Sequence, residues 1–112
     1  MDKQKLEKTY KYYTKLFAED EELAKIYNTV TYQGLFNPAF LQANSKWNSM
    51  DDIIWRSGFG IVNLAEVENV NMDKWNEYVR KNTEMDTWYD FGKLAMIEWM
   101  KAQLEANKKK KN

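Results

Sequence analysis

The apolar residues in the last quarter of the chain surround the helix axis instead of keeping to one side of it. On a helical wheel one wide face holds Met85, Trp88, Phe91, Gly92, Ala95, Trp99, Ala102 and Ala106, while a second set points elsewhere, namely Leu94, Ile97 and Leu104. Such a helix must be covered by two or more other elements. We therefore predict a buried helix over residues 83–107, which begins at the capping hydroxyl of Thr83. Trp88, Ala95 and Trp99 are expected in the core.

The first thirty residues carry an amphipathic pattern that is interrupted once. The apolar stripe recurs at helical spacing, with lysines beside or opposite it, at Leu6, Tyr10, Tyr13 and Phe17. The acidic cluster 19–22 interrupts this stripe, which resumes in a shifted phase from Leu23 onward. We therefore predict two helices with a break near Asp20. One long helix over residues 2–30 is the alternative.

Polar capping residues divide the middle of the chain into short helices. A side-chain oxygen at a helix start accepts from otherwise unpaired N–H groups, and proline is tolerated at the first position. The predicted helices run over residues 39–46 after Asn37 and Pro38, 50–57 after Ser49, 63–68 from Asn63, and 72–82 after Asn71. Glu66 matches a capping box with Asn63, and Gly58 is a favourable left-handed stop for the helix before it. Residues 29–36 are predicted to form a loop, because no second strand exists to pair with them.

These elements predict an all-α fold, in which a single compact domain of about six helices surrounds the C-terminal helix. We assign residues 1–107 to this domain and residues 108–112 to a basic tail that we expect to be disordered. Met-Asp-x-Trp occurs at both Met72 and Met85. Helix capping explains this recurrence, and we infer no repeat from it.

The composition removes most of the side-chain chemistry that enzymes use. The chain has no histidine and no cysteine, so it lacks the usual general base near neutral pH and any thiolate nucleophile or ligand. Its carboxylate groupings lie at or near predicted helix starts, where they interact favourably with the helix dipole. We therefore expect a protein that is not an enzyme, with no catalytic residues, no metal site and no cofactor.

Charge and hydropathy narrow the expected compartment and partner. The 17 basic and 17 acidic residues cancel, so the chain lacks the strong net charge typical of nucleic-acid-binding domains. No segment has the pattern of a signal peptide or approaches the ~18 apolar residues of a membrane span, which predicts a cytoplasmic protein without a membrane partner. The excess of lysine over arginine, together with abundant asparagine, is typical of AT-rich coding and favours a low-GC bacterium, or one of its phages or plasmids, as the origin.

One stretch has the order of features found in a DNA-binding motif. A helix ends at the turn glycine Gly58, and the apolar Phe59 follows it. Leu64 and Val67 then anchor a second helix. This order resembles the helix-turn-helix of the repressor family, which implies a DNA-binding regulatory protein that uses residues 50–69 together with the basic C-terminal tail. The side chains that would face the major groove include no lysine or arginine, although base and phosphate contacts rely mostly on those two.

The leading expectation is therefore a non-enzymatic interaction protein, an adaptor or inhibitor, that binds another protein or a second copy of itself. If Leu64 and Val67 are buried, then Val62 and Glu66 must project outward, with Ile61 and Asn63 at their flanks. Loops that carry aromatic residues are also common binding elements. The predicted partner-binding residues are Ile61, Val62, Asn63, Glu66 and Trp47. DNA binding is the alternative.

Overall fold

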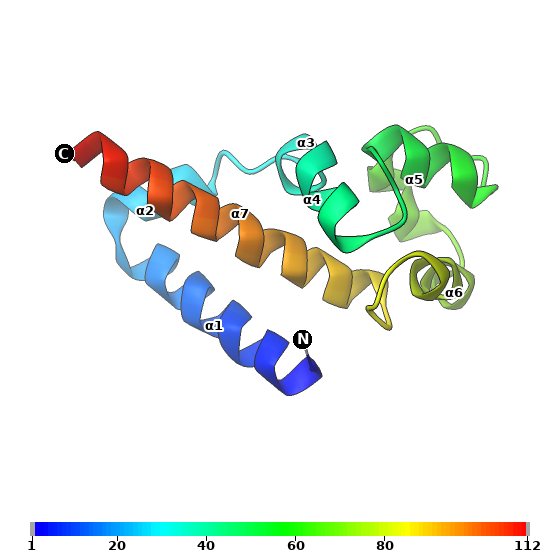
Figure 1. Ribbon diagram of the computed structural model, residues 1–112, viewed down its shortest axis with the longest axis horizontal. Helices are drawn as coiled ribbons and strands as arrows, with labels where there is room; N and C mark the ends of the chain where they lie inside the picture. Colours follow the sequence, from blue (N-terminus) through cyan, green and yellow to red (C-terminus); the bar gives the residue numbers. More distant parts are fainter. Residues whose placement is uncertain (1, 112) are drawn as a thin grey trace. The chain divides into compact units, whose positions relative to one another are not determined.

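The computed structural model describes residues 2–111, with side chains described for residues 2–109. Within these residues the chain is all-α, as predicted, and contains no β-strand. In chain order the elements are α1 (Lys3–Glu19), α2 (Glu21–Tyr27), α3 (Tyr32–Leu35), α4 (Pro38–Asn44), α5 (Met50–Ser57), the 3-10 helix η1 (Leu64–Asn69), α6 (Met72–Asn82) and α7 (Trp88–Lys111) (Figure 1). The short helix α3 lies where the sequence predicted a loop.

Within the chain, the contacts define two compact units. The terminal unit comprises the residues up to Leu35 and those from Gly92 onward, and the central unit comprises Phe36–Phe91. One boundary therefore lies inside α7, whose first turn belongs to the central unit. Neither boundary carries a glycine-, proline- or serine-rich linker, so composition gave no sign of the division.

The terminal unit is built from α1, α2, α3 and the greater part of α7. Its buried apolar residues are Leu6, Phe17, Leu23, Leu94, Ala95, Ile97 and Met100. The predicted break near Asp20 is confirmed, because this residue is extended, with φ −108° and ψ 122°. Its carboxylate accepts from the N–H of Leu23 at 3.0 Å and so caps α2.

The long C-terminal helix begins five residues later than the sequence predicted. Thr83 does not start α7 but ends α6, because its hydroxyl donates to the carbonyl of Val79 at 3.0 Å. The cap of α7 is Thr87, whose hydroxyl oxygen accepts from the N–H of Asp90 at 3.0 Å. At its other end α7 continues through Lys111, four residues beyond the predicted end. Asn112, the last residue of the predicted tail, lies outside the described residues.

The burial of α7 is less complete than the sequence predicted. Ala95 is in the core, as expected, whereas Trp88 and Trp99 are only partly buried. Trp99 packs at the edge of the terminal core, with its ring centroid 6.4 Å from that of Phe17. Farther along, Ala102 and Ala106 are exposed. Here the core covers one side of the helix, on which Leu104 packs, and leaves these alanines in solvent.

A partly buried ion pair joins α1 to α7 within the terminal unit. Lys93 is buried, and its ammonium donates to the carboxylate of Glu7. The same ammonium lies over the ring of Tyr10, 5.5 Å from its centroid. This hydrogen bond is the main reason why the pKa of the Glu7 carboxyl falls below its ordinary value of 4.5.

We expect Glu7→Gln to lower the thermal stability near neutral pH, and the difference from the wild type to shrink in acid. Because the folded-state pKa is lowered, the stabilisation is present above the ordinary pKa and is lost as the pH falls through the folded-state value. Thermal melts at roughly pH 7, 5 and 3 measure this. Glu19→Gln is the matched control, since Glu19 pairs with Lys15 at 3.9 Å in an exposed position. Equal effects of the two variants would contradict a special role for Glu7.

In the central unit, two helices end in turns that have the same hydrogen-bonding pattern. Asn44 and Asn82 end α4 and α6, and their side-chain amides donate to carbonyls four residues earlier, at 3.0 and 2.9 Å. Ser45 and Thr83 follow, and the hydroxyl oxygen of each accepts from the N–H two residues later, at 3.0 and 2.9 Å. Ser49 and Thr87 then cap the next helices. The sequence therefore contains a repeat with an offset of 38 residues, which the Met-Asp-x-Trp recurrence did not reveal.

The two matching turns are paired with each other. Ser45 and Thr83 form an isolated antiparallel bridge, in which the N–H of Lys46 donates to the carbonyl of Asn82 at 2.8 Å. Tyr78 adds a second connection, because its hydroxyl accepts from Trp47 Nε1 at 3.0 Å and donates to the carbonyl of Ile53 at 2.7 Å. The start of α5 and the turn before it are thus fixed against α6.

Candidate interaction surface

The helix α5 presents a tryptophan to solvent. Ser49 caps this helix, and Ile53 on its inner face is fully buried. Trp55 follows two residues later, which places it on the opposite side of the helix. Its side chain is 81% exposed, the highest value among the large hydrophobic residues described. Because tryptophan is usually highly buried, a ring in this position is a candidate contact residue.

The turn after α5 is held in shape by glycines and by one anchored aromatic ring. Gly58 and Gly60 have φ angles of 72° and 73°, a left-handed conformation that favours glycine. Between them Phe59 points inward, and its ring packs edge-on against Trp75 with 5.2 Å between centroids. The N–H of Phe59 donates to the hydroxyl of Ser57 at 3.2 Å. The turn therefore has a defined path that leads to Val62.

The carboxylate of Glu66 holds the backbone of the residues that follow the turn. It accepts from the N–H of Val62 at 2.6 Å and from the N–H of Asn63 at 2.9 Å. These two donors lower the pKa of the Glu66 carboxyl below its ordinary value. Leu64 and Val67 are buried, as predicted, and hold η1 against the central unit. Val62 is left 79% exposed by this arrangement.

A cavity of about 270 Å³ lies between α5 and the turn. It is lined by Asp51, Ile54, Trp55, Gly58, Gly60, Ile61 and Val62. The positions that a Cβ atom would take at the two glycines meet open space, so the glycines leave this side of the cavity uncovered. We call this cavity and the exposed parts of its lining residues the Trp55–Val62 surface. Its volume is slightly below ~300 Å³, the lower end of the usual range for small-molecule pockets. A cavity of this volume can accept an apolar side chain of a partner protein.

The structure brings together only some of the predicted site residues. Val62 is exposed and Ile61 is partly buried, and both line the cavity, with the exposed Asn63 next in the chain. Glu66 is partly buried, and its carboxylate caps the backbone of η1. Trp47 is fully buried, with its Nε1 bonded to Tyr78, and so it is not a surface contact.

Trp55 is the residue that the sequence reasoning missed. A signal for it was present in the sequence, because Trp55 is the one large aromatic residue in the predicted helix 50–57 and lies off the stripe that contains Ile53. The dense aromatic content of the chain hid this signal, since any of its five tryptophans could have belonged to the core.

The segment that resembled a helix-turn-helix differs from that motif in its second element. Leu64–Asn69 is a 3-10 helix of six residues, not the α-helix that such motifs place in the major groove. Residues 50–69 also carry four carboxylates and one arginine, a balance that disfavours contact with phosphates. The local geometry therefore favours an apolar contact over the reading of DNA.

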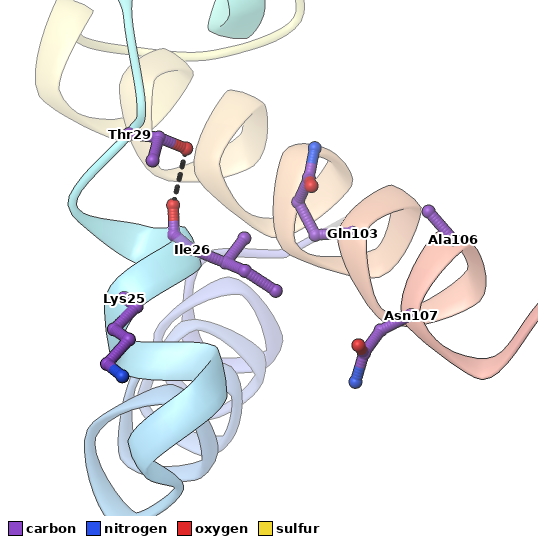
Figure 2. Close-up of a pocket in the computed structure, with 6 residues that line it drawn as sticks. All are labelled: Lys25, Ile26, Thr29, Gln103, Ala106 and Asn107. Carbon is purple, nitrogen blue, oxygen red and sulfur yellow. Dashed lines mark hydrogen bonds between the residues drawn. The ribbon is translucent and has the colours of Figure 1, made fainter. Parts of the chain in front are cut away.

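A second cavity, of about 290 Å³, lies in the terminal unit between α2 and the C-terminal part of α7 (Figure 2). Its lining is Lys25, Ile26, Thr29, Gln103, Ala106 and Asn107. In Figure 2 the side chain of Ile26 points toward α7, and the hydroxyl of Thr29 donates to the carbonyl of Ile26 at 2.7 Å. This hydrogen bond thus caps the C-terminal end of α2. The cavity brings together no buried polar group that would select a ligand.

The described part of the chain offers little other chemistry. Among its residues, no group of three or more acidic side chains is placed to hold a metal ion. None of its helices combines the length and the apolar character that crossing a membrane requires. Comparison of the chain with family models, curated proteins and solved structures finds no match.

Proposed function

We propose that this chain is a non-enzymatic interaction protein that binds another protein through the Trp55–Val62 surface. The observation that carries the proposal is the pairing of two almost fully exposed apolar side chains, Trp55 and Val62, beside a cavity. Contact sites of proteins typically combine an aromatic anchor with a neighbouring pocket, and tryptophan is enriched among the residues that dominate binding energy.

The shape of this surface is set before any partner arrives. The backbone that carries Val62 is fixed by two N–H groups that donate to the Glu66 carboxylate, by the left-handed glycines and by the packing of Phe59 on Trp75. A surface that is already ordered loses little conformational entropy on binding. This makes an apolar patch of modest area an effective contact site.

The charges beside the surface specify the chemistry of the partner. Asp51 lines the cavity, and Glu68 is exposed on η1. Asp52 is less suited to pair with a partner, because its carboxylate accepts from the N–H of Asn48 at 2.8 Å. A complementary segment therefore presents a large apolar side chain to the cavity and a lysine or arginine to Asp51. An adaptor or an inhibitor would use such a contact.

We expect Val62→Asp to weaken partner binding by at least tenfold while the protein stays folded. A charge that must be desolvated in an interface typically costs several kcal/mol, whereas the same charge on the free surface costs little. Photo-crosslinking with p-benzoylphenylalanine at position 55, in the native host, identifies the partner. The purified partner is then titrated with the wild type and with Val62→Asp.

Tyr89→Asp is the matched control, because Tyr89 is 71% exposed and does not line the cavity. Circular dichroism and thermal melts of both variants establish that they are folded. Loss of folding in Val62→Asp would place Val62 in the core. Unchanged binding by the folded variant would place the contact face elsewhere in the chain.

A further inference from the structure

The helix α1 has an outward face that the protein-binding proposal does not use. Its inward side is fixed by Leu6 and Phe17, both of which are buried. On the outward side, Lys5, Lys8, Lys11 and Lys15 are all exposed. These positions fall on one arc of the helix, spaced three or four residues apart. Their ammonium groups therefore form a ridge about 15 Å long along the helix.

An exposed aromatic ring lies within this ridge. Tyr12 is 63% exposed and falls on the same arc as Lys8 and Lys15. Its ring contacts that of Tyr13 edge-on, with 5.0 Å between centroids, and this contact limits its orientations. We name Tyr12 and the four lysines the lysine–tyrosine face.

The carboxylates of α1 cancel only part of the charge of this face. Glu7 lies at the edge of the arc, one turn before Lys11, and its carboxylate interacts with that lysine, but it also accepts from the buried ammonium of Lys93. The first carboxylate on the outward arc is that of Glu19 in the last turn, 3.9 Å from the ammonium of Lys15. The first four turns of the arc therefore carry lysines and no carboxylate, although the whole chain is neutral.

We propose that the lysine–tyrosine face binds single-stranded nucleic acid. Lysines at intervals of about 5 Å along a helix can follow successive phosphates, and an exposed tyrosine between them provides a surface on which a base stacks. Stacking of a base on Tyr12 also distinguishes this ligand from an acidic peptide that has no aromatic residue, such as polyglutamate. The apolar side of α1 is occupied by the core, so this helix has no free apolar face to insert into a membrane surface.

The test measures fluorescence anisotropy of a labelled single-stranded oligothymidylate of about 20 nucleotides, titrated with the full chain. Four phosphate contacts predict a slope of log affinity against log salt of about −3, so the affinity falls about 50-fold between roughly 50 and 200 mM salt. Tyr12→Ala is expected to weaken binding about tenfold through the loss of stacking. The double variant Lys8→Gln/Lys11→Gln is expected to flatten the slope by about 1.4.

The controls separate a specific face from general attraction to polyanions. Tyr89→Ala and Lys74→Gln/Lys81→Gln change exposed residues outside α1 and are expected to leave both affinity and slope unchanged. Circular dichroism confirms that each variant is folded. Three results would each overturn the proposal: no binding at low salt, equal affinity of Tyr12→Ala and the wild type, or equally tight binding of polyglutamate or of phosphatidylserine vesicles.

Discussion

Trp47→Ala is expected to lower the free energy of unfolding by about 3–5 kcal/mol. The ring of Trp47 is fully buried, and its centroid lies 5.4 Å from that of Tyr78 and 5.6 Å from that of Phe91. Truncation removes these contacts, opens a cavity in the central unit and leaves the hydroxyl of Tyr78 without its donor. Chemical denaturation monitored by circular dichroism measures the loss.

Trp55→Ala is the matched control for this measurement, because it removes the same side chain from an exposed position. Its effect on the free energy of unfolding is expected to stay within about 0.5 kcal/mol. A cost below about 1 kcal/mol for Trp47→Ala, or a similar cost for the two variants, would contradict the assignment of one ring to the core and the other to the surface.

Tyr78→Phe is expected to cost about 1–3 kcal/mol, although it removes a single oxygen atom. The change leaves Trp47 Nε1 without its acceptor and the carbonyl of Ile53 without its donor. Both groups belong to the interior side of the central unit, where burial also raises the pKa of the Tyr78 hydroxyl. Equilibrium unfolding in urea measures the cost.

A double-mutant cycle tests whether the hydrogen bond between Trp47 and Tyr78 contributes to this cost. Trp47→Phe removes the Nε1 donor, so the combination with Tyr78→Phe is expected to cost less than the two single changes added together. Tyr89→Phe serves as the exposed control. Additive costs in the cycle would mean that the hydrogen bond between these side chains contributes nothing to stability.

Local capping chemistry explains why most helices of this chain could be predicted from the sequence. Asn37, Ser49 and Asn71 each accept from an N–H three residues later, so the start of each helix is specified by one side chain. The left-handed Gly58 ends α5 in the same local way. Interactions of this range are visible in the sequence, because the partners are close along the chain.

The sequence could not reveal features that depend on distant residues. Thr83 has the side chain of a helix cap, but its hydroxyl bonds back to Val79 and its backbone pairs with Ser45, 38 residues earlier. The burial of Trp47 likewise depends on Tyr78 in another helix. Met-Asp-x-Trp recurs as identical residues, whereas the matching turns share hydrogen-bonding types more than identical residues.

The candidate site was predicted in part for the same reason. The burial of Leu64 and Val67 follows from the local periodicity of apolar residues. The same periodicity correctly predicted that Val62 is exposed. The predicted capping box is also present, because the Glu66 carboxylate accepts from the N–H of Asn63; its second bond, from the N–H of Val62, was not predicted. Nor could periodicity show that Trp55 and Val62 line one cavity, which depends on the path of the turn between them.

The most direct test of the account is the affinity of the purified partner for Trp55→Ala, compared with the wild type by isothermal titration calorimetry. If Trp55 is the anchor of the Trp55–Val62 surface, its truncation is expected to weaken binding about 30-fold or more, while Tyr89→Ala binds as the wild type does. Equal affinity of folded Trp55→Ala and the wild type would contradict the central claim that this surface is the contact face.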